Sequence, residues 1–549
     1  MELTACSVPV LFILQPGCDP EQDLRKLALN HNTTLTSLPM CQGQEQAASS
    51  LIKFSALEGH WVLLSNIHLV PSFTRHLESI ITTALNDASL SHKSSYSGVD
   101  VSSMFRLFVT TDPSTVLPIR VLQRKLKVCL ELPTGLQKNM FHLYSKVIDD
   151  QLLEQCKHPQ YKDLVYVMAF LHSVLLERRN YSTLGWNVRY VFSQSDFEAS
   201  VATLCTVLDN GMDSMHGEQL KYLIGEIMYG GRVSDMYDRR IVKIFMDEYI
   251  GDYTQNPDQF AFYPDRLGRY KIPSSHYLEH IEKTLPFNHS AELIGLHASA
   301  DTGLHNDLYQ DLVFHLKEMY PEVNVKTKDQ VVEEGLAGQV CMDDILECHL
   351  SRLYSGVLID EWRALAPPTT MKLGAWLEQF KQRGEQYRYW IDFGDPLVMW
   401  LPGLHYPYSY FTAIIQKEVS KKEGWSLDRC SMYTEMSKFT QAIDVEEPPP
   451  EGAYVNGLYL QGAHWDLASS CLVAPASSSA LVEPLPILTI IPKETSKIGW
   501  GNTLCTPVYR SLALTKRDKS EFEVNLRMSP IVDKSVYVLR GVTLFLDME

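Results

Sequence analysis

Two short segments carry residue types that could act on a nucleotide. The first, Gln15-Pro16-Gly17-Cys18-Asp19-Pro20, follows an apolar run at 8–14. A phosphate-binding P-loop reads GxxxxGK followed by Ser or Thr, because backbone amides and a lysine neutralise the phosphates while the hydroxyl holds magnesium. This segment offers one glycine, two prolines without an amide hydrogen, and an aspartate that repels phosphate. Gly17 is therefore a nucleotide-binding candidate that lacks most of the phosphate cradle.

The second segment, Ser65-Asn66-Ile67-His68, closes the apolar run that begins at Trp61. A nucleotidase presents carboxylates at this place, to hold magnesium and to position water. Asparagine and neutral histidine are poor substitutes for that pair. His68 and Asn66 could be polar catalytic groups, but we favour the interpretation that they are strand-end residues hydrogen-bonded to neighbouring loops.

Other catalytic and metal-binding patterns are missing from the sequence. It contains no GxSxG, no HExxH and no CxxC, so esterase, metalloprotease and zinc-module chemistry have no motif to rest on. The 11 cysteines are scattered and odd in number, which indicates a reducing compartment with free, mostly packed thiols. We therefore predict no catalytic residue, no bound metal and no cofactor.

Composition narrows the class of protein further. A chain of 549 residues exceeds the size of one hydrophobic core, so two to four domains are expected. A formal charge of -17 disfavours non-specific binding to nucleic acid or anionic lipid. No apolar stretch has the roughly 18 to 20 residues of a membrane-spanning helix. The run at 8–14 lacks a preceding basic segment, so it is interpreted as a buried strand rather than a signal peptide.

Hydrophobic patterning divides the chain into successive regions. Up to about residue 133, near-continuous apolar runs at 8–14, 61–69 and 105–111 alternate with helical spacers, which predicts a parallel α/β sheet. An all-α region follows to about residue 298. The region 299–549 begins with helices and, from 446 to the end, turns to β-rich patterns typical of a small barrel or sandwich.

Three helices of the all-α region are predicted in detail. The run 163–179 is apolar around most of its circumference, which indicates a helix buried in a bundle. Ser195, with Glu198 three residues later, predicts the capped start of a second helix. A third helix, 218–229, is expected to end with a left-handed glycine at Gly230 or Gly231. The charged runs 177–179 and 235–240 are interpreted as solvated helix ends or internal salt bridges.

A resemblance rests on motifs spread over the whole chain in a fixed order. They are CQGQ at 41–44, WVLLSNIHL at 61–69, RLFVTTDPS at 106–114, LPTGLQKN at 132–139, LERRNYSTLGWN at 176–187, YGGRVSDMYDRR at 229–240, LPFN at 285–288, GLHASAD at 295–301, GLYLQGAHWD at 457–466, CTPVYRS at 505–511 and LRGVTLF at 539–545. Together they resemble the end of dynein heavy chains, and the form YVNGLYLQGAHWD resembles axonemal more than cytoplasmic members.

The resemblance implies three domains. Residues 1–133 look like the large subdomain of the sixth AAA+ module, 134–298 like its helical lid, and 299–549 like the dynein C-terminal domain, helical over 299–445 and β-rich over 446–549. In that family the sixth module is a structural member of the ring that binds no nucleotide. Arg232 occupies a lid position where active AAA+ proteins place a phosphate-sensing arginine, and a structural salt bridge is the expected role here.

The implied function is that of a structural and regulatory portion of a heavy chain, in minus-end-directed ciliary or flagellar movement. The full-length motor of the family is an ATPase, whereas this chain is not expected to be an enzyme by itself. Expected partners are the other ring modules, the intermediate and light chains indirectly, and the microtubule through the full motor. Location in cytoplasm, cytoskeleton and axoneme follows. The sequence does not decide whether the chain is a piece of a longer heavy chain or a free-standing protein. The alternative function is a free-standing nucleotide-binding or protein-interaction module using Gly17, His68 and Arg232.

Overall fold

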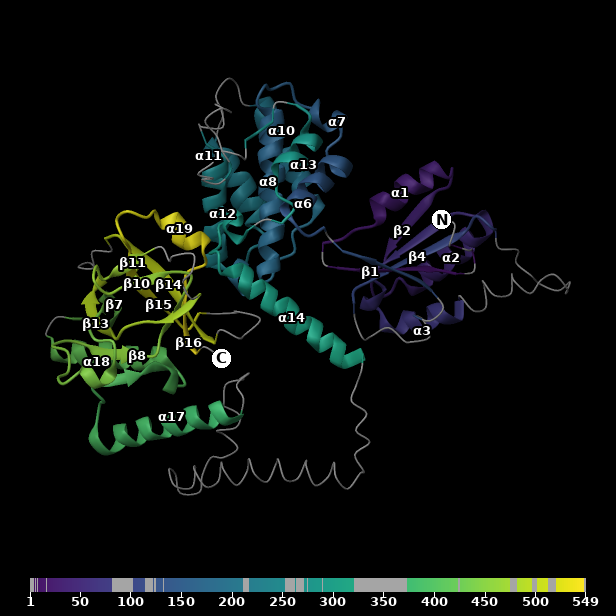
Figure 1. Ribbon diagram of the computed structural model, residues 1–549. Helices are drawn as coiled ribbons and strands as arrows, with labels where there is room; N and C mark the ends of the chain where they lie inside the picture. Colours follow the sequence, from purple (N-terminus) through teal and green to yellow (C-terminus); the bar gives the residue numbers. More distant parts are fainter. Residues whose placement is uncertain are drawn as a thin grey trace, which may run out of the picture. The chain divides into compact units, whose positions relative to one another are not determined.

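The computed structural model places the chain in two compact units (Figure 1). The first unit comprises Met1–Gln155 with Val191–Ala202, and the second comprises Cys156–Tyr190 with Thr203–Glu549. The structure describes residues 4–80 without 5, 7 and 16; 102–113; 122; 125–210 without 132; 217–319 without 252–261, 263–270, 274 and 289; and 373–547 without 423–424, 474–480, 496–500 and 512–519.

A five-stranded parallel sheet forms the centre of the first unit. Its order is β2 (Leu35–Pro39), β3 (Trp61–Ser65), β4 (Arg106–Thr111), β1 (Val10–Leu14) and β5 (Leu126–Leu130). The predicted parallel α/β sheet is thus present. Because every neighbouring pair is parallel, the strands end along one common edge, where loops lead into the following segments.

Helices cover both faces of this sheet. Alternate residues of β1 point to opposite sides: Val10 and Phe12 pack with α1 (Glu21–Asn30), and Leu11 packs with α2 (Glu45–Glu58) and α3 (Pro71–Ile80). Figure 1 shows α1 on one side of the strands and α2 with α3 on the other. Burial on both faces explains why β1, β3 and β4 are nearly continuous apolar runs.

The two strands that sequence patterns do not predict, β2 and β5, are the edges of the sheet. Both contain polar residues, such as Thr36 and Lys127, that are exposed to solvent. Edge strands are covered less completely than central ones, so they lack the continuous apolar signature. The predicted run 61–69 also divides, because β3 ends at Ser65 and a 3₁₀ turn, η1 (Ile67–Leu69), follows.

The second unit is organised around one buried helix, α8 (Tyr161–Arg178). Almost all of its residues are buried, as its apolar circumference predicts. Other helices of the same unit follow in the chain: α9 (Ser182–Gly185), α11 (Gly217–Leu220), α12 (Met236–Tyr249), α13 (Tyr277–Thr284) and α14 (Ala300–Met319). The helix α10 (Gln194–Asn210) lies between α9 and α11 in the sequence.

Two predicted helix ends are wrong in detail. The helix α10 begins at Gln194, before Ser195, and the capping residues are Ser193 and Asp196, whose carboxylate accepts from the Ser193 backbone N–H at 2.8 Å and from its hydroxyl at 3.1 Å. The third helix continues from α11 as a π-helix, η5 (Lys221–Tyr229). Gly230 has φ of −64° and so is not left-handed.

The reason for glycine at this π-helix end is space rather than dihedral angle. The Gly230 N–H donates to the carbonyl of Gly225, five residues earlier, at 2.9 Å. A Cβ atom on Gly230 would lie 2.6 Å from that carbonyl oxygen and from the carbonyl oxygen of Glu226. Such a distance is far below van der Waals contact, so a side chain at this position would break the wider turn.

The β-rich region of the second unit contains two larger sheets. One has the order β12 (Val482–Pro484), β9 (Tyr459–Gln461), β16 (Thr543–Asp547), β14 (Thr503–Ser511) and β15 (Phe522–Arg527). The other runs β6 (Val398–Trp400), β8 (Ala453–Asn456), β13 (Leu488–Glu494) and β7 (Cys430–Met436). A ribbon of β10 (His464–Asp466) and β11 (Cys471–Val473), with helices α17 (Leu373–Phe393), α18 (Pro407–Lys421) and α19 (Lys534–Leu539), completes the described part.

The two larger sheets enclose one hydrophobic core, which includes Val455 and Ile490 from one sheet and Leu504 and Leu544 from the other. At one edge the Thr434 side chain of β7 bonds the backbone of Asn525 in β15. A barrel or a sandwich stays a prediction. Among the residues that the structure describes, no helix combines the length and the apolar content needed to cross a membrane.

Candidate functional site

The shared edge of the parallel sheet is where an α/β domain of this kind would bind a ligand. After β1, Gly17 has a positive φ of 97°, and the Cys18 N–H donates to the Gln15 carbonyl at 3.1 Å, so the backbone makes a tight turn. The Asp19 carboxylate then accepts from the Glu21 N–H at 2.9 Å, at the start of α1. An anion site would need such amides free for phosphate, whereas here a carboxylate of the protein itself takes one.

His68 lies at the same edge, in η1 after β3. Its Nδ1 accepts from the Asp112 N–H at 3.3 Å, and its Nε2 lies 3.4 Å from an Asp112 carboxylate oxygen. The backbone N–H of Asn66 donates to the Thr110 hydroxyl at 2.9 Å. These contacts tie the end of β3 to the end of β4, and His68 is engaged in them from both ring nitrogens.

The three candidate residues are therefore distributed as follows. Gly17 and His68 follow β1 and β3, which both pair with β4, so the fold brings them to one edge of one sheet. Arg232 belongs to the second unit, in the turn after η5, where its backbone N–H donates to the Tyr229 carbonyl at 3.1 Å. Its side chain is exposed.

A buried polar assembly in the second unit surrounds Arg178, at the end of α8. This side chain is completely buried, and its Nε, Nη1 and Nη2 donate to the carbonyls of Gly185, Ile294 and Leu539 at 2.9, 3.0 and 2.7 Å. The guanidinium also lies 5.7 Å from the ring centroids of both Trp186 and Phe245. Charged donors form strong hydrogen bonds in a low-dielectric interior. A single arginine thus joins the helical region to α19 of the β-rich region.

Two glycines make room for this arginine. A Cβ on Gly185 would lie 1.7 Å from the Arg178 carbonyl oxygen, which no side chain permits. Gly295 has φ of +84°, and a Cβ there would approach the Leu539 Cβ to 3.2 Å. Both positions therefore require glycine, and they lie inside the sequence runs that carry the family resemblance, LERRNYSTLGWN and GLHASAD.

The start of α12 adds a second buried contact. Asp235 caps the helix by accepting from the N–H groups of Tyr237 and Asp238 at 3.0 and 3.1 Å. Asp238 is fully buried and accepts from the N–H groups of Asn187 and Val188 at 3.1 and 3.2 Å. Burial raises the pKa of Asp238 to about 6, although the hydrogen bond from the Asn187 N–H works against this shift.

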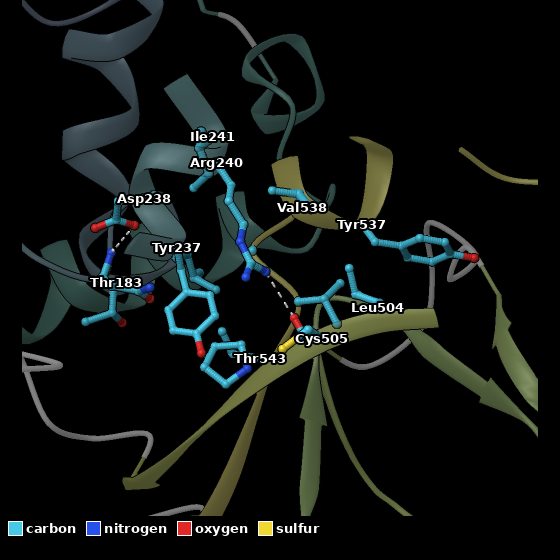
Figure 2. A pocket seen from close by; sticks show the side chains of 16 residues that line it. Thr183, Tyr237, Asp238, Arg240, Ile241, Leu504, Cys505, Tyr537, Val538 and Thr543 are labelled. Atoms are coloured by element: carbon cyan, nitrogen blue, oxygen red, sulfur yellow. Dashed lines mark hydrogen bonds between the residues drawn. The ribbon is translucent and has the colours of Figure 1, made fainter. Parts of the chain in front are cut away.

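The same helix reaches the β-rich region through Tyr237 and Arg240 (Figure 2). The Tyr237 hydroxyl donates to the Glu523 carboxylate, which also accepts from the Cys505 thiol at 2.9 Å. Arg240 lies over the Tyr237 ring, 4.9 Å from its centroid, and donates to the Cys505 carbonyl at 3.4 Å. Burial raises the pKa of Glu523, but hydrogen bonds from Cys505 and Tyr237 outweigh it and hold that pKa below the usual value.

The cavity beside these residues has a volume of only about 40 Å³. That space suffices for one or two water molecules and is far below the several hundred Å³ of small-molecule sites. We call this assembly of side chains the lid seam. It consists of Arg178, Asp235, Tyr237, Asp238, Arg240, Cys505 and Glu523. Its geometry is that of a fixed junction between two regions, and it offers no room for a substrate.

Sequence reasoning finds the edge residues but misses the lid seam. The interpretation of Arg178 as part of a solvated helix end is wrong, because the side chain is completely buried and donates to three backbone carbonyls. Its position at the end of a helix that is otherwise apolar all round is the available signal. The acceptor at Leu539 lies 361 residues later and carries no recognisable side-chain pattern.

Comparison with known families assigns the successive regions. Residues 5–129 match the model for the dynein heavy chain region D6 P-loop domain, 161–300 that for the dynein heavy chain AAA lid domain, and 322–546 that for the C-terminal domain of the dynein heavy chain. A parallel α/β domain, a helical lid and a last domain, matched in this order along the chain, are the parts that these models describe in dynein heavy chains. The protein belongs to the dynein heavy chain family.

Axonemal and flagellar heavy chains are among the relatives that resemble this chain. Dynein axonemal heavy chain 10 of Homo sapiens is 37% identical over 573 residues, which cover 91% of this chain and 12% of the relative. The dynein-1-alpha heavy chain of the flagellar inner arm I1 complex of Chlamydomonas reinhardtii is 35% identical over 615 residues, 99% of this chain and 13% of the relative. Dynein axonemal heavy chain 5 of Mus musculus is 28% identical over 98% of this chain and 13% of its own length. The protein thus spans about an eighth of these relatives.

Proposed function

We propose that this protein serves as the ring-closing and regulatory C-terminal portion of an axonemal dynein heavy chain. The observation that carries the proposal is the ordered match of three dynein models to 5–129, 161–300 and 322–546. In this proposal, minus-end-directed movement along microtubules in cilia or flagella is an activity of the complete motor. The remaining ring modules are the direct partners, and intermediate and light chains act indirectly. The proposed domains are 1–133, 134–298 and 299–549.

We further propose that this portion hydrolyses no nucleotide of its own. Support comes from the sheet edge, where the turn at Gly17 has a single glycine and Asp19 takes a helix amide that a phosphate would need. His68 is engaged by Asp112 on the neighbouring strand end. Two prolines remove further amide donors from the same loop.

The experiment is a nucleotide-binding and turnover assay on the 549-residue protein. Labelled ATP and ADP should bind no more tightly than about 100 μM, and hydrolysis should stay at background. The matched control is the Arg232→Ala variant, which should behave identically. Saturable binding in the micromolar range that is lost in Arg232→Ala would instead support a nucleotide-binding module using Gly17, His68 and Arg232.

The regulatory part of the proposal needs the complete heavy chain. Within an axonemal heavy chain, loosening the lid seam by a change equivalent to Arg178→Lys should alter the rate of microtubule gliding while leaving microtubule affinity in the absence of nucleotide unchanged. A matched exposed change, equivalent to Arg388→Lys, should alter neither. Unchanged gliding in the seam variant, at normal protein level, would contradict a regulatory role.

A further inference from the structure

Two thiols and a carboxylate converge near the start of α8. Cys156 precedes the helix, and Cys205 and Asp209 lie one turn apart on α10. The Cys156 Sγ lies 3.2 Å from Asp209 Oδ1, and the Cys205 Sγ lies 3.6 Å from Asp209 Oδ2. One sulfur from each cysteine and one carboxylate oxygen all lie within 4.8 Å of one another. This cluster lies apart from the lid seam and takes no part in it.

The spacing fits a tetrahedral metal ion. With zinc–sulfur and zinc–oxygen bonds of about 2.3 and 2.0 Å, a sulfur and an oxygen on one tetrahedral zinc are separated by about 3.5 Å. The two sulfur–oxygen distances, 3.2 Å to Oδ1 and 3.6 Å to Oδ2, lie close to this value, and one carboxylate oxygen and both sulfurs lie within 4.8 Å of one another, inside the reach of a single ion. The backbone N–H of His158 donates to the Cys156 Sγ at 3.5 Å, a contact that supports a ligand sulfur.

We propose that Cys156, Cys205 and Asp209 form a zinc site, with water as the fourth ligand. Two cysteine sulfurs select a thiophilic cation over magnesium or calcium. Both cysteines are buried, whereas Asp209 is exposed, so the ion has an entry path from solvent and a position open to water. On binding, the two thiol protons leave to solvent and the ion takes their place beside the carboxylate. The zinc then fastens the segment before α8 to α10.

The test is metal binding by the 549-residue protein, purified under reducing conditions and treated with a chelator. Zinc is added back, excess is removed by gel filtration, and metal content is measured by mass spectrometry. Cobalt(II) serves as the spectroscopic probe, because two thiolates give sulfur-to-cobalt charge-transfer bands and a tetrahedral site gives strong visible bands. We expect one zinc per protein molecule and both cobalt signatures.

Three variants separate this site from chance binding. Cys205→Ser should weaken zinc binding at least about 100-fold, beyond the 10–100-fold effect of an outer hydrogen-bond partner. Asp209→Asn, at an exposed position that tolerates substitution, should also weaken it and shift the cobalt spectrum. The control Cys471→Ser removes a buried cysteine of the same unit and should retain the zinc.

Several results would overturn the site. Absence of bound zinc in the unaltered protein would do so, as would unchanged zinc content in Asp209→Asn and Cys205→Ser, or equal loss in Cys471→Ser. Peptide mapping without reductant is the remaining check. A Cys156–Cys205 disulfide in a protein that binds no zinc after reduction would assign the pair to redox chemistry instead.

Discussion

The sheet edge of the first unit and the lid seam of the second unit differ in how residue type relates to role. In both, residues of the kind found in active sites make structural contacts, but only the lid seam includes completely buried charged side chains, those of Arg178 and Asp238. At the sheet edge, a glycine turn and a histidine occupy the place where chemistry is expected, yet the turn bonds within its own loop and the histidine accepts from the loop after β4. In the lid seam, an arginine, an aspartate and a tyrosine (Arg240, Asp238 and Tyr237), of types common in active sites, line a cavity of about 40 Å³. The charges there hold two regions together.

Burial and the identity of the hydrogen-bond acceptor therefore distinguish a charged side chain with a structural role from one with a catalytic role. Arg178 is fully buried and donates to three carbonyls contributed by segments far apart in the sequence. The ring nitrogens of His68 contact the neighbouring strand end. Stability of the second unit should consequently depend on the lid seam far more than stability of the first unit depends on its sheet edge.

The largest expected effect is that of Arg178→Met. The change leaves three buried carbonyls without these donors, so the free energy of unfolding of the second unit should fall by about 3 to 5 kcal/mol. Arg178→Lys keeps the charge but cannot reach three acceptors, and it should recover only part of the loss. Urea denaturation provides the measurement. The control Arg388→Met changes an exposed side chain of α17, and an equal loss there would refute the contrast between the two regions.

Asp238 should give the lid seam a measurable pH dependence. Its folded pKa of about 6 lies above the ordinary value of an aspartate, 3.8, so its stabilising contribution is complete below about pH 4 and is lost as pH rises through 6. The Asp238→Asn variant lacks this dependence. Between pH 4.5 and 7, its free energy of unfolding should therefore improve relative to the unaltered protein by about 1 to 3 kcal/mol.

That measurement needs a reference for other titrating groups. Asp392→Asn, which removes an exposed carboxylate of α17, should track the unaltered protein across the same pH range. If the difference for Asp238→Asn were independent of pH, the buried carboxylate would have an ordinary pKa, and its burial would not be an energetic feature of the seam.

A smaller effect is expected where α12 meets β15. Tyr237→Phe removes the hydroxyl that donates to Glu523, and the free energy of unfolding should fall by about 1 kcal/mol. Combining it with Glu523→Gln in a double-mutant cycle should give a coupling energy of similar size. Strict additivity would mean that this hydrogen bond contributes nothing to the junction, and the lid seam would then reduce to Arg178 and Asp238.

The smallest effect belongs to the sheet edge. His68→Gln should change the free energy of unfolding by less than about 0.5 kcal/mol, because the paired Asp112 carboxylate is more than half exposed. Isothermal titration calorimetry with ATP should give no binding heat for either the unaltered protein or the variant. A His68→Gln variant with altered nucleotide binding would restore the edge as a functional site and remove the contrast with the lid seam.

Much of the fold is predictable because its strongest signals are local. Burial on both faces makes β1 and β4 recognisable as apolar runs, and burial all round makes α8 recognisable as a core helix. The edge strands β2 and β5 escape prediction because half-covered strands carry no such run. The sequence pattern assigns Gly230 to the wrong cause, since a π-turn leaves no trace in a pattern based on a period of 3.6 residues.

The lid seam and the cysteine cluster escape prediction for a different reason. Arg178 donates to backbone carbonyls, and a carbonyl is present at every residue, so nothing in the sequence marks Leu539 as an acceptor. Cys156 and Cys205 are too far apart to form a spacing motif, and only the packing of α10 near the start of α8 brings their sulfurs to one carboxylate. Tertiary structure creates both groupings.

The carbonyl of Leu539 sets the order in which the molecule can be completed during synthesis. Arg178 leaves the ribosome 361 residues before that acceptor. At about 5 to 20 residues per second, the guanidinium waits roughly 20 to 70 s for its last partner. During that interval the end of α8 must stay open to water or rest on a chaperone. If translation stopped after the helices, the Arg178 guanidinium would lack its Leu539 acceptor and would remain exposed to solvent.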